Sequence, residues 1–573
     1  MLSRATVLAL AVALASCDSG MVLRPVVDAF VPQLDASTPD MGTDAGPPPH
    51  DFCTELMIPH IAFTPGAGGT RFGDQAGDFT VHPIDGTTWS LRDQWSGCES
   101  YVVFVHLPGF TDRLFTTPFD HLFTDGPRNV QYFFASDDPD PGARRTFAMA
   151  QAAQLEMGFA FEGTSADDQT FWRSRFHFLT DQATSITGSI GPLLTQYDAY
   201  RITAAAGVDV GGGRGRAYPP PPAVFGIDRA QHFDAGDSLA QSVAASDNSL
   251  LGMAAYLGHF YNYRATLESR LASEASSTTV VSLVDMTTAT RTFTQTVMLP
   301  DRATMATFDT LELDAIVDCQ NQNPFACSEW DRIADVNLCV DGAACTQRRE
   351  LGRWITPYWR RGRQHYVMDA SALLGLLRAG GTQTFFVELG PDWERATMWH
   401  ASVSLRFRHR GGVPSATGAE RAFTGGTFDG TYNAMHMPFT FTPPAGTTRV
   451  ELVTILTGHG QDATNNCAEW CDHHHTFTVN TTALPMITHV GMSIGSPLGC
   501  AARARDGVIP GQLGNWEQAR AYWCPGLAVA PVRTDITSMV TIGSPNTLSY
   551  TGSFSGGAPR AGDIDLSAYV AYY

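Results

Sequence analysis

The chain has 573 residues, a formal net charge of -20 at pH 7 and 37 basic residues, none of which is a lysine. A chain of this length forms about three domains. A net negative charge of this size argues against nucleic acid, or an anionic membrane face, as the partner.

The first residues have the pattern of an export signal. Arg4 precedes an apolar run of 11 residues, 5 to 15, which is shorter than the roughly 20 residues that span a bilayer. Leu14-Ala15-Ser16-Cys17 resembles the lipobox of bacterial lipoproteins, which implies that residues 1 to 17 form a lipoprotein signal peptide and that Cys17 becomes the acylated N-terminus. We therefore expect an exported bacterial lipoprotein, periplasmic or on the cell surface, with membrane contact only through this anchor. Residues 18 to 53, rich in Pro and Asp, are expected to form a disordered tether.

Residues 54 to 250 predict a separate α/β domain. The segments 77 to 81, 85 to 91, 101 to 105 and 225 to 229 resemble parts of thioredoxin-like proteins. Residues 107 to 112, which follow the first core strand, contain no cysteine. We therefore expect a structural or docking module without dithiol redox chemistry. Apolar residues at helical spacing predict a connecting helix over 251 to 276.

Two β-rich segments follow, 277 to 411 and 416 to 573, each with the size and turn density of an antiparallel sandwich. In residues 401 to 408 apolar and polar residues alternate, as in a strand with one buried face. Cys-Ser-Glu-Trp-Asp-Arg at 327 to 332 and Cys-Ala-Glu-Trp-Cys at 467 to 471 stand at corresponding points of the two segments. This repetition predicts a site between two domains, on rims where loops carry function.

The cysteines predict a set of disulfides. Of the 11 cysteines, ten are left once Cys17 is set aside, an even number that favours disulfides in an exported chain. Proximity in the sequence predicts the pairs Cys319–Cys327, Cys339–Cys345, Cys467–Cys471 and Cys500–Cys524, which leaves Cys53 for Cys98.

Five motifs carry a longer resemblance. The stretches 327 to 332, 352 to 359, 467 to 471, 514 to 516 and 523 to 526 resemble, in order and spacing, the peptide-N-glycosidase F family of bacterial amidases that remove N-linked glycans. The resemblance covers about residue 280 to the end. It implies a mainly β fold of two side-by-side, eight-stranded antiparallel jelly rolls with the active site in the cleft between them. Here the α/β thioredoxin-like domain precedes them.

The resemblance also implies roles for single residues. Asp331 corresponds to the principal catalytic carboxylate, Glu469 to a second essential acid and Glu388 to a third. The substrate-binding residues that it implies are Arg332, Arg520, Trp470, Trp393 and His459. Where the family has Gly-Trp-Gly-His, this chain has Leu456-Thr457-Gly458-His459, so Thr457 replaces a tryptophan expected to contact substrate. The family implies no metal and no cofactor.

The activity implied is hydrolysis of the amide between asparagine and N-acetylglucosamine in an N-glycosylated peptide or protein, by a monomer. The products are aspartate and a glycosylamine. Because an amide is a poor electrophile, a carboxylate such as Asp331 has to activate water, and Arg332 or Arg520 is expected to donate to the developing oxyanion.

Two alternatives stay open. One is a non-catalytic glycan-binding lipoprotein that keeps the cleft. The other is a copper-dependent monooxygenase of paired jelly-roll fold, with ligands from Asp472-His473-His474-His475. On a strand His473 and His475 share a face, but two ligands are too few for a metal site.

Overall fold

A computed structural model describes residues 51–109, 111–112, 114–195, 224–235, 251–288, 291–319, 330–390, 400–460, 468–470, 473–487, 496–512, 515–554, 558–559 and 562–573. Among the residues with an expected role, Cys17, Cys327, Trp393, Cys467 and Cys471 lie outside this part. In the described part, no helix combines the length and the hydropathy of a membrane span. The expected tether is wrong at its end, because helix α1 (Phe52–Leu56) begins inside it and Cys53 is bonded to Cys98.

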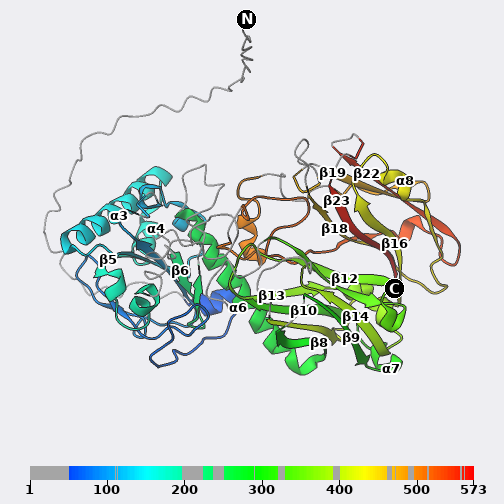
Figure 1. Ribbon diagram of the computed structural model, residues 1–573, viewed down its shortest axis with the longest axis horizontal. Helices are drawn as coiled ribbons and strands as arrows, with labels where there is room; N and C mark the ends of the chain where they lie inside the picture. The colour runs from blue at the N-terminus through cyan, green and yellow to red at the C-terminus, as the bar shows by residue number, and fades with distance from the viewer. Residues whose placement is uncertain are drawn as a thin grey trace, which may run out of the picture. The chain divides into compact units, whose positions relative to one another are not determined.

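The N-terminal part of the described chain is an α/β sheet domain (Figure 1). Its five-stranded sheet has the order β5-β4-β3-β6-β7, with β3, β4 and β5 parallel and β6 and β7 antiparallel to their neighbours. Parallel strands are covered on both faces, which explains why β4 is buried along its whole length. The strands are β1 (Thr80–Val81), β2 (Trp89–Ser90), β3 (Ser100–His106), β4 (Val130–Ser136), β5 (Phe176–Gln182), β6 (Val224–Ile227) and β7 (Phe233–Ala235), and the helices are η1 (Leu114–Thr116), α2 (His121–Thr124), α3 (Pro141–Glu162), α4 (Ala166–Arg173) and η2 (Ala183–Ser185).

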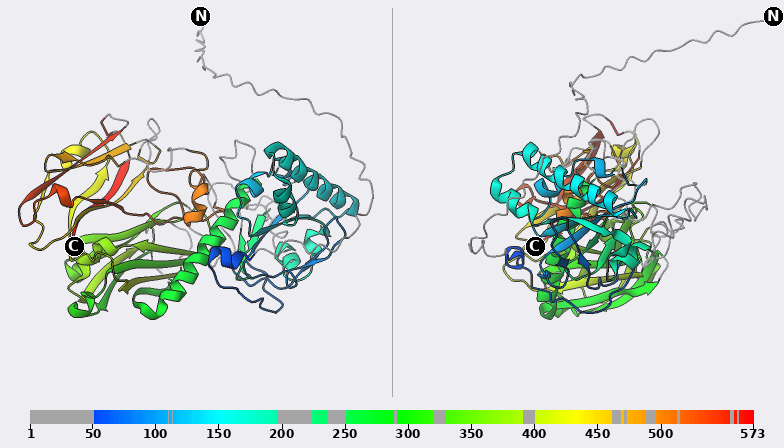
Figure 2. Two further views of the ribbon diagram at one scale, coloured as in Figure 1. Left: turned by 180° about the vertical axis from the view of Figure 1, so that it is seen from behind. Right: turned by 90° about the vertical axis from the view of Figure 1, so that its left-hand side faces the viewer.

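A long helix, α6 (Ala255–Glu274), leads from this domain into the β-rich part of the chain. It lies between the short helices η5 (Gly252–Ala254) and η6 (Ala275–Ser277). Its apolar residues are buried, and it packs both on β3 and on η10 (Ala501–Asp506), drawn in orange beside it in Figure 2. The helix therefore touches the N-terminal sheet and a late segment of the chain at once.

The next eight strands form a sandwich of two four-stranded antiparallel sheets, ordered β13-β10-β15-β8 and β12-β11-β14-β9. The first strand thus pairs with the eighth and the second with the seventh, which is the wrapping of a jelly roll. The strands are β8 (Thr278–Thr288), β9 (Thr292–Leu299), β10 (Thr310–Cys319), β11 (Ile333–Cys339), β12 (Arg348–Ile355), β13 (Gly362–Asp369), β14 (Gly381–Glu388) and β15 (His400–Arg408), and the helices between them are α7 (Arg302–Met305), η8 (Gly342–Ala344) and η9 (Ser371–Leu377).

The last eight strands repeat the same connectivity, with sheets ordered β16-β23-β18-β21 and β17-β22-β19-β20. The expected mainly β fold with two antiparallel jelly rolls is therefore confirmed. The strands are β16 (Gly418–Thr427), β17 (Phe439–Phe441), β18 (Val450–His459), β19 (His473–Val479), β20 (Thr482–Ala483), β21 (Val532–Asp535), β22 (Asn546–Phe554) and β23 (Asp563–Tyr572), and the helices are α8 (Tyr432–Met435), η10 and η11 (Thr537–Met539).

The repeated connectivity explains why two similar motifs occur. Asp331 lies just before β11 and Glu469 just before β19. Each is thus on the connection between the third and the fourth strand of its sandwich. Equivalent loops of equivalent folds carry the two acids.

The two sandwiches meet along β12, an edge strand of the first. Residues 526 to 529 of the second sandwich continue its ladder, because the amide of Ile355 donates to the carbonyl of Leu527 at 3.0 Å and that of Val529 to Arg353 at 2.9 Å. A single hydrophobic core runs through this contact and includes Trp354, Trp516 and Trp523. The loops at the end of β12 are therefore fixed relative to both sandwiches.

The disulfides Cys53–Cys98, Cys339–Cys345 and Cys500–Cys524 form as predicted. Cys319 is also disulfide-bonded. The expected pair Cys467–Cys471 lies outside the described residues.

Candidate active site

The carboxylates of Asp331 and Glu469 both lie next to one nitrogen atom, Nε of Arg520. Nε of Arg520 lies 3.0 Å from Oε1 of Glu469 and 3.4 Å from Oδ2 of Asp331. The two carboxylates come from different sandwiches and are 138 positions apart in the sequence (469 − 331). Their side chains keep 11% and 18% of their surface exposed, whereas that of Arg520 has none. A small molecule can therefore reach the two acids from outside, and the guanidinium lies beneath them.

All five N–H donors of Arg520 are used inside the protein. Beyond Glu469, they bind the carbonyls of Asn515 and Gln518, the side-chain oxygen of Asn515 and the hydroxyl of Tyr358, at 2.9 to 3.0 Å. An arginine has no further donors. The expected substrate-binding role of Arg520 is thus corrected by the structure: the side chain is buried and positions the acids.

Aromatic rings surround this guanidinium. Its central carbon lies 4.6 Å from the ring centre of Trp470 and 5.1 Å from that of Trp523. Trp470 is half-buried beside Glu469 and Trp523 is fully buried. Trp470 therefore lies beside the two acids with its ring on the cation, and its expected contact with a sugar stays a prediction.

Tyr358 is a site residue that the sequence reasoning missed. Its hydroxyl donates to Asp331 and accepts from Nη2 of Arg520 at 3.0 Å. Burial, together with the charge of Asp331, raises the pKa of Tyr358, so the phenol stays protonated. The motif at 352 to 359 contains this tyrosine, but nothing in the motif distinguishes it from the packed residues around it.

The acids are held in an environment that favours their neutral forms. Burial raises the pKa of Asp331 to about 7, with Glu469 acting in the same direction and Arg520 against it. Burial also raises the pKa of Glu469, again against the opposing charge of Arg520. A carboxyl that titrates near pH 7 is a typical general base or acid.

His459 lies on the Trp523 side of the site. Its ring stacks on Trp523 with centroids 4.8 Å apart. Burial and the charges of Arg353 and Arg520 lower its pKa to about 3, so the imidazole is neutral. Among the described residues no group hydrogen-bonds its Nε2. This nitrogen atom is itself buried, and the expected role of His459 in substrate binding stays a prediction.

Glu388 and Arg332, two further residues with an expected role, have contacts of their own. Glu388 ends β14 as the cross-strand neighbour of Asp335, four residues beyond Asp331, and its charge acts on Asp335. Glu388 therefore lies beside Asp335, and its expected catalytic role stays a prediction. The amide and the carbonyl of Arg332 bind Thr356 at 2.8 Å each, and its side chain passes close to Gly390.

Thr457 is fully buried and accepts a hydrogen bond from Nη1 of Arg353. The threonine that replaces the expected tryptophan therefore makes a buried contact inside the protein. Thr457 lies at the contact surface between the two sandwiches, which we call the seam.

That seam contains a second group of charges. Arg353 pairs with Glu350 through Nε and Nη2 at 2.8 and 2.7 Å, and Glu350 also accepts from Ser567 of the second sandwich at 2.6 Å. Burial, together with Glu350 and Glu388, raises the pKa of Asp335 to about 8. Asp335 is therefore mostly protonated at neutral pH.

His473 and His475 form a hydrogen-bonded chain in β19. Nε2 of His473 lies 2.8 Å from the carbonyl of Ala468, its Nδ1 lies 2.9 Å from Nε2 of His475, and Nδ1 of His475 lies 2.7 Å from the hydroxyl of Tyr550. Because a carbonyl can only accept, His473 carries its proton on Nε2. These nitrogen atoms hold the backbone next to Glu469.

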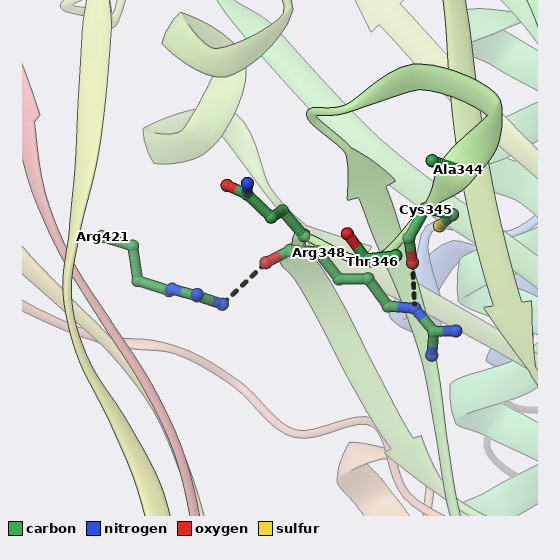
Figure 3. Close-up of a pocket in the computed structure, with 6 residues that line it drawn as sticks. Ala344, Cys345, Thr346, Arg348 and Arg421 are labelled. Atoms are coloured by element: carbon green, nitrogen blue, oxygen red, sulfur yellow. Dashed lines mark hydrogen bonds between the residues drawn. The ribbon is translucent and has the colours of Figure 1, made fainter.

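A surface pocket of about 640 Å³ lies elsewhere, at η8 and the start of β12 (Figure 3). Its lining residues include Arg348 and Arg421 but no carboxylate. Arg421 donates to the carbonyl of Arg348 and Arg348 to that of Cys345, at 2.6 and 3.3 Å. The pocket is at the far end of β11 and β12 from Asp331 and is not part of the acid site.

The fold and the site define a twin jelly-roll protein with a buried arginine that joins one acid from each sandwich. The family model described as peptide-N-glycosidase F, C terminal, matches residues 429–571. Peptide-N(4)-(N-acetyl-beta-D-glucosaminyl)asparagine amidase F of Elizabethkingia miricola is 31% identical over 271 residues, which are 44% of this chain and 69% of the relative. The chain belongs to the peptide-N-glycosidase F family.

Solved structures of the family also align with this chain. A crystal structure of peptide-N(4)-(N-acetyl-beta-D-glucosaminyl)asparagine amidase covers 52% of this chain and 96% of its own, at 24% identity and a TM-score of 0.41. The structure of PNGase F from Flavobacterium meningosepticum aligns over 52% of this chain and 95% of its own, at 23% identity and a TM-score of 0.39.

Gly458 tests the placement of the Glu469 loop. A methyl group there would lie 2.2 Å from the carbonyl of Ala468 and 2.5 Å from Nε2 of His473, so Gly458→Ala has to push this loop outward. We expect at least a tenfold loss of kcat, on the order of what misplaced catalytic groups cost, measured on an N-glycopeptide. Gly430→Ala, where nothing lies within 4 Å, is the control. Equal activity in both variants would contradict this placement.

Asp335 predicts a pH dependence of stability. Its pKa of about 8 in the folded protein lies above the unfolded value of about 3.9. The folded state therefore binds this proton more tightly, and stability decreases as pH rises from about 4 to about 8. Asp335→Asn should lack this component, so Tm between pH 5 and 8 should decrease less than in the unaltered protein. Asp429 is half-buried and hydrogen bonds from Thr431 lower its pKa, so Asp429→Asn should leave the dependence between pH 5 and 8 unchanged. An unchanged slope in Asp335→Asn would contradict the assignment.

Proposed function

We propose that this protein hydrolyses the amide between asparagine and N-acetylglucosamine in N-glycosylated peptides or proteins, giving aspartate and a glycosylamine. The observation that carries the proposal is the convergence of Asp331 and Glu469 on Nε of Arg520. Membership of a family whose relative is named as such an amidase supports the same reaction.

In the proposed mechanism ionised Asp331 is the base. Its Oδ2 is buried and lies 3.4 Å from Nε of Arg520, and Tyr358 donates to the carboxylate and fixes its direction. Asp331 takes a proton from a water molecule as that water attacks the amide carbon. The proton then passes to the leaving nitrogen, so that the C–N bond breaks and the sugar leaves as an amine.

Glu469 and Arg520 support this step. The guanidinium balances part of the charge of the two carboxylates, so that one of them can ionise near neutral pH although both are buried. Glu469, fixed by Nε of Arg520, orients the water or the acetamido group of the sugar. Trp470 lies against the guanidinium of Arg520 and offers an apolar face for the sugar ring.

The decisive experiment measures the mass of the peptide product. The unaltered protein should convert the glycosylated asparagine of a defined N-glycopeptide to aspartate, which differs in mass from asparagine. Asp331→Asn should fold with an unchanged circular dichroism spectrum and lose about 10³-fold or more in kcat, within the usual range for a general base. Glycopeptide binding by the unaltered protein without any release of glycan would identify a binding protein instead, and full activity in Asp331→Asn would remove this residue from the mechanism.

The pKa of Asp331 predicts the pH profile. Because the base has to be ionised, kcat/KM should increase with pH and level off above about 7. Glu469 raises the pKa of Asp331, so the residual activity of Glu469→Gln should reach its plateau at a lower pH. A midpoint that stays in place, or moves upward, would contradict the assignment of Asp331 as the base.

A further inference from the structure

The N-terminal sheet domain reaches the active site through one buried ion pair. Asp234 belongs to β7 of that domain, and Arg360 follows Trp359 in the first sandwich. Nη2 of Arg360 donates to Oδ1 of Asp234 at 2.7 Å, and the side chains are only 2% and 14% exposed. A charge buried this deeply requires a partner, and its loss leaves an uncompensated charge. Arg360 therefore depends on a residue outside the sandwich that contains it.

The neighbouring arginine contacts the same domain. The guanidinium carbon of Arg361 lies 4.5 Å from the ring centre of Phe72. Nη1 of Arg360 donates to the backbone carbonyl of Arg361 at 2.9 Å, so the Arg360 side chain is fixed against the backbone of its neighbour. Two consecutive residues of the first sandwich are thus fixed by the N-terminal domain.

Arg360 also binds a segment of the second sandwich that holds Tyr358. Its Nε donates to the carbonyl of Pro510 at 2.9 Å. Two residues later, Gln512 accepts from the amide of Tyr358 at 3.0 Å through its side-chain oxygen. Tyr263 of α6 packs against Gly507 at the start of the same segment. Residues 507 to 512 therefore lie between the N-terminal domain and the active-site tyrosine.

Tyr358 completes the connection to the acids. Its hydroxyl donates to Asp331 and accepts from Arg520. Between Tyr358 and Arg360, Trp359 has a φ of 36°, a left-handed conformation that residues with side chains adopt only when their surroundings impose it. The anchored neighbours on both sides supply that constraint.

We infer that the N-terminal sheet domain is part of the catalytic apparatus, and that Asp234 is a positioning residue that fixes Tyr358, and with it Asp331, through Arg360. The inference deepens the proposed amidase function and rests on it for its kinetic test. It gives the additional domain a role in the reaction rather than in substrate recognition.

The test is kinetic and uses the full chain. Asp234→Asn keeps the shape of the side chain and removes its charge. Because the acids shift while the sugar-facing surface is kept, kcat on an N-glycopeptide should decrease about tenfold or more, and KM should change less than about threefold. In a double-mutant cycle with Arg360→Met, the double variant should be no slower than Arg360→Met alone, since both changes break one connection.

Asp228→Asn is the matched control. Asp228 is a buried carboxylate of the same domain that pairs with Arg264 of α6 and has no contact with Arg360. It should lower Tm as much as Asp234→Asn does and leave kcat within about twofold. A kcat for Asp234→Asn within twofold of the unaltered protein, or an equal kcat loss in both variants, would overturn the inference.

Hydrogen exchange separates this inference from the proposed function. The amide of Tyr358, bonded to Gln512, should exchange faster in Asp234→Asn and at the unaltered rate in Asp228→Asn. If the unaltered protein releases no glycan from N-glycopeptides, the amidase proposal fails, and the exchange result alone decides whether Asp234 positions Tyr358. Unchanged exchange at Tyr358 would overturn the inference whatever the activity.

Discussion

The buried guanidinium of Arg520 is the interaction on which the site depends. Burying an arginine without acceptors is very costly, and here each of its five N–H groups has one. With no donor left over, the side chain has a single arrangement, and so have the carboxylates that bind it. The same cation offsets the repulsion between Asp331 and Glu469, which come from separate sandwiches. One residue thus brings the acids together and allows one of them to ionise.

The two acids could be predicted from the sequence, because their loops are equivalent. Two jelly rolls with the same strand order place the same loop at the same corner, and a motif that recurs before the fourth strand of each marks that corner. The role of Arg520 could not be predicted in this way. The same motif can contain an arginine that binds substrate or an arginine whose N–H donors are all hydrogen-bonded within the protein. Only the positions of Asn515, Gln518 and Tyr358 in the folded chain distinguish the two cases. The neighbours of Glu388 could not be predicted for a related reason, because the pairing of β14 with β11, which puts Glu388 beside Asp335, is not encoded in a motif.

Thr457 and Gly458 show how small residues serve the same geometry. Thr457 is smaller than the tryptophan expected at this position. Its hydroxyl accepts a hydrogen bond from Arg353, which also binds Glu350. Gly458 has no side chain, so the loop with Glu469 lies against the backbone of β18. A larger residue at either position would separate the surfaces that bring Glu469 to Arg520. The replacement of an expected tryptophan by threonine is therefore consistent with an intact acid site.

Charged contacts at the seam fix the alignment of one sandwich against the other more than they add to the stability of the fold. A buried ion pair gains little over a well-packed apolar contact, but a wrong alignment leaves its charges unpaired. Glu350 binds Arg353 on its own strand and Ser567 on the facing sandwich. If one sandwich slid along the other, Glu350 and Ser567 would lose this hydrogen bond. Arg360 applies the same constraint at a third surface, because its partners lie in the N-terminal sheet and in the second sandwich. Catalysis by two acids on separate sandwiches requires their relative position to hold within a fraction of an ångström, and directional, charged contacts can fix a position that apolar packing leaves free to slide.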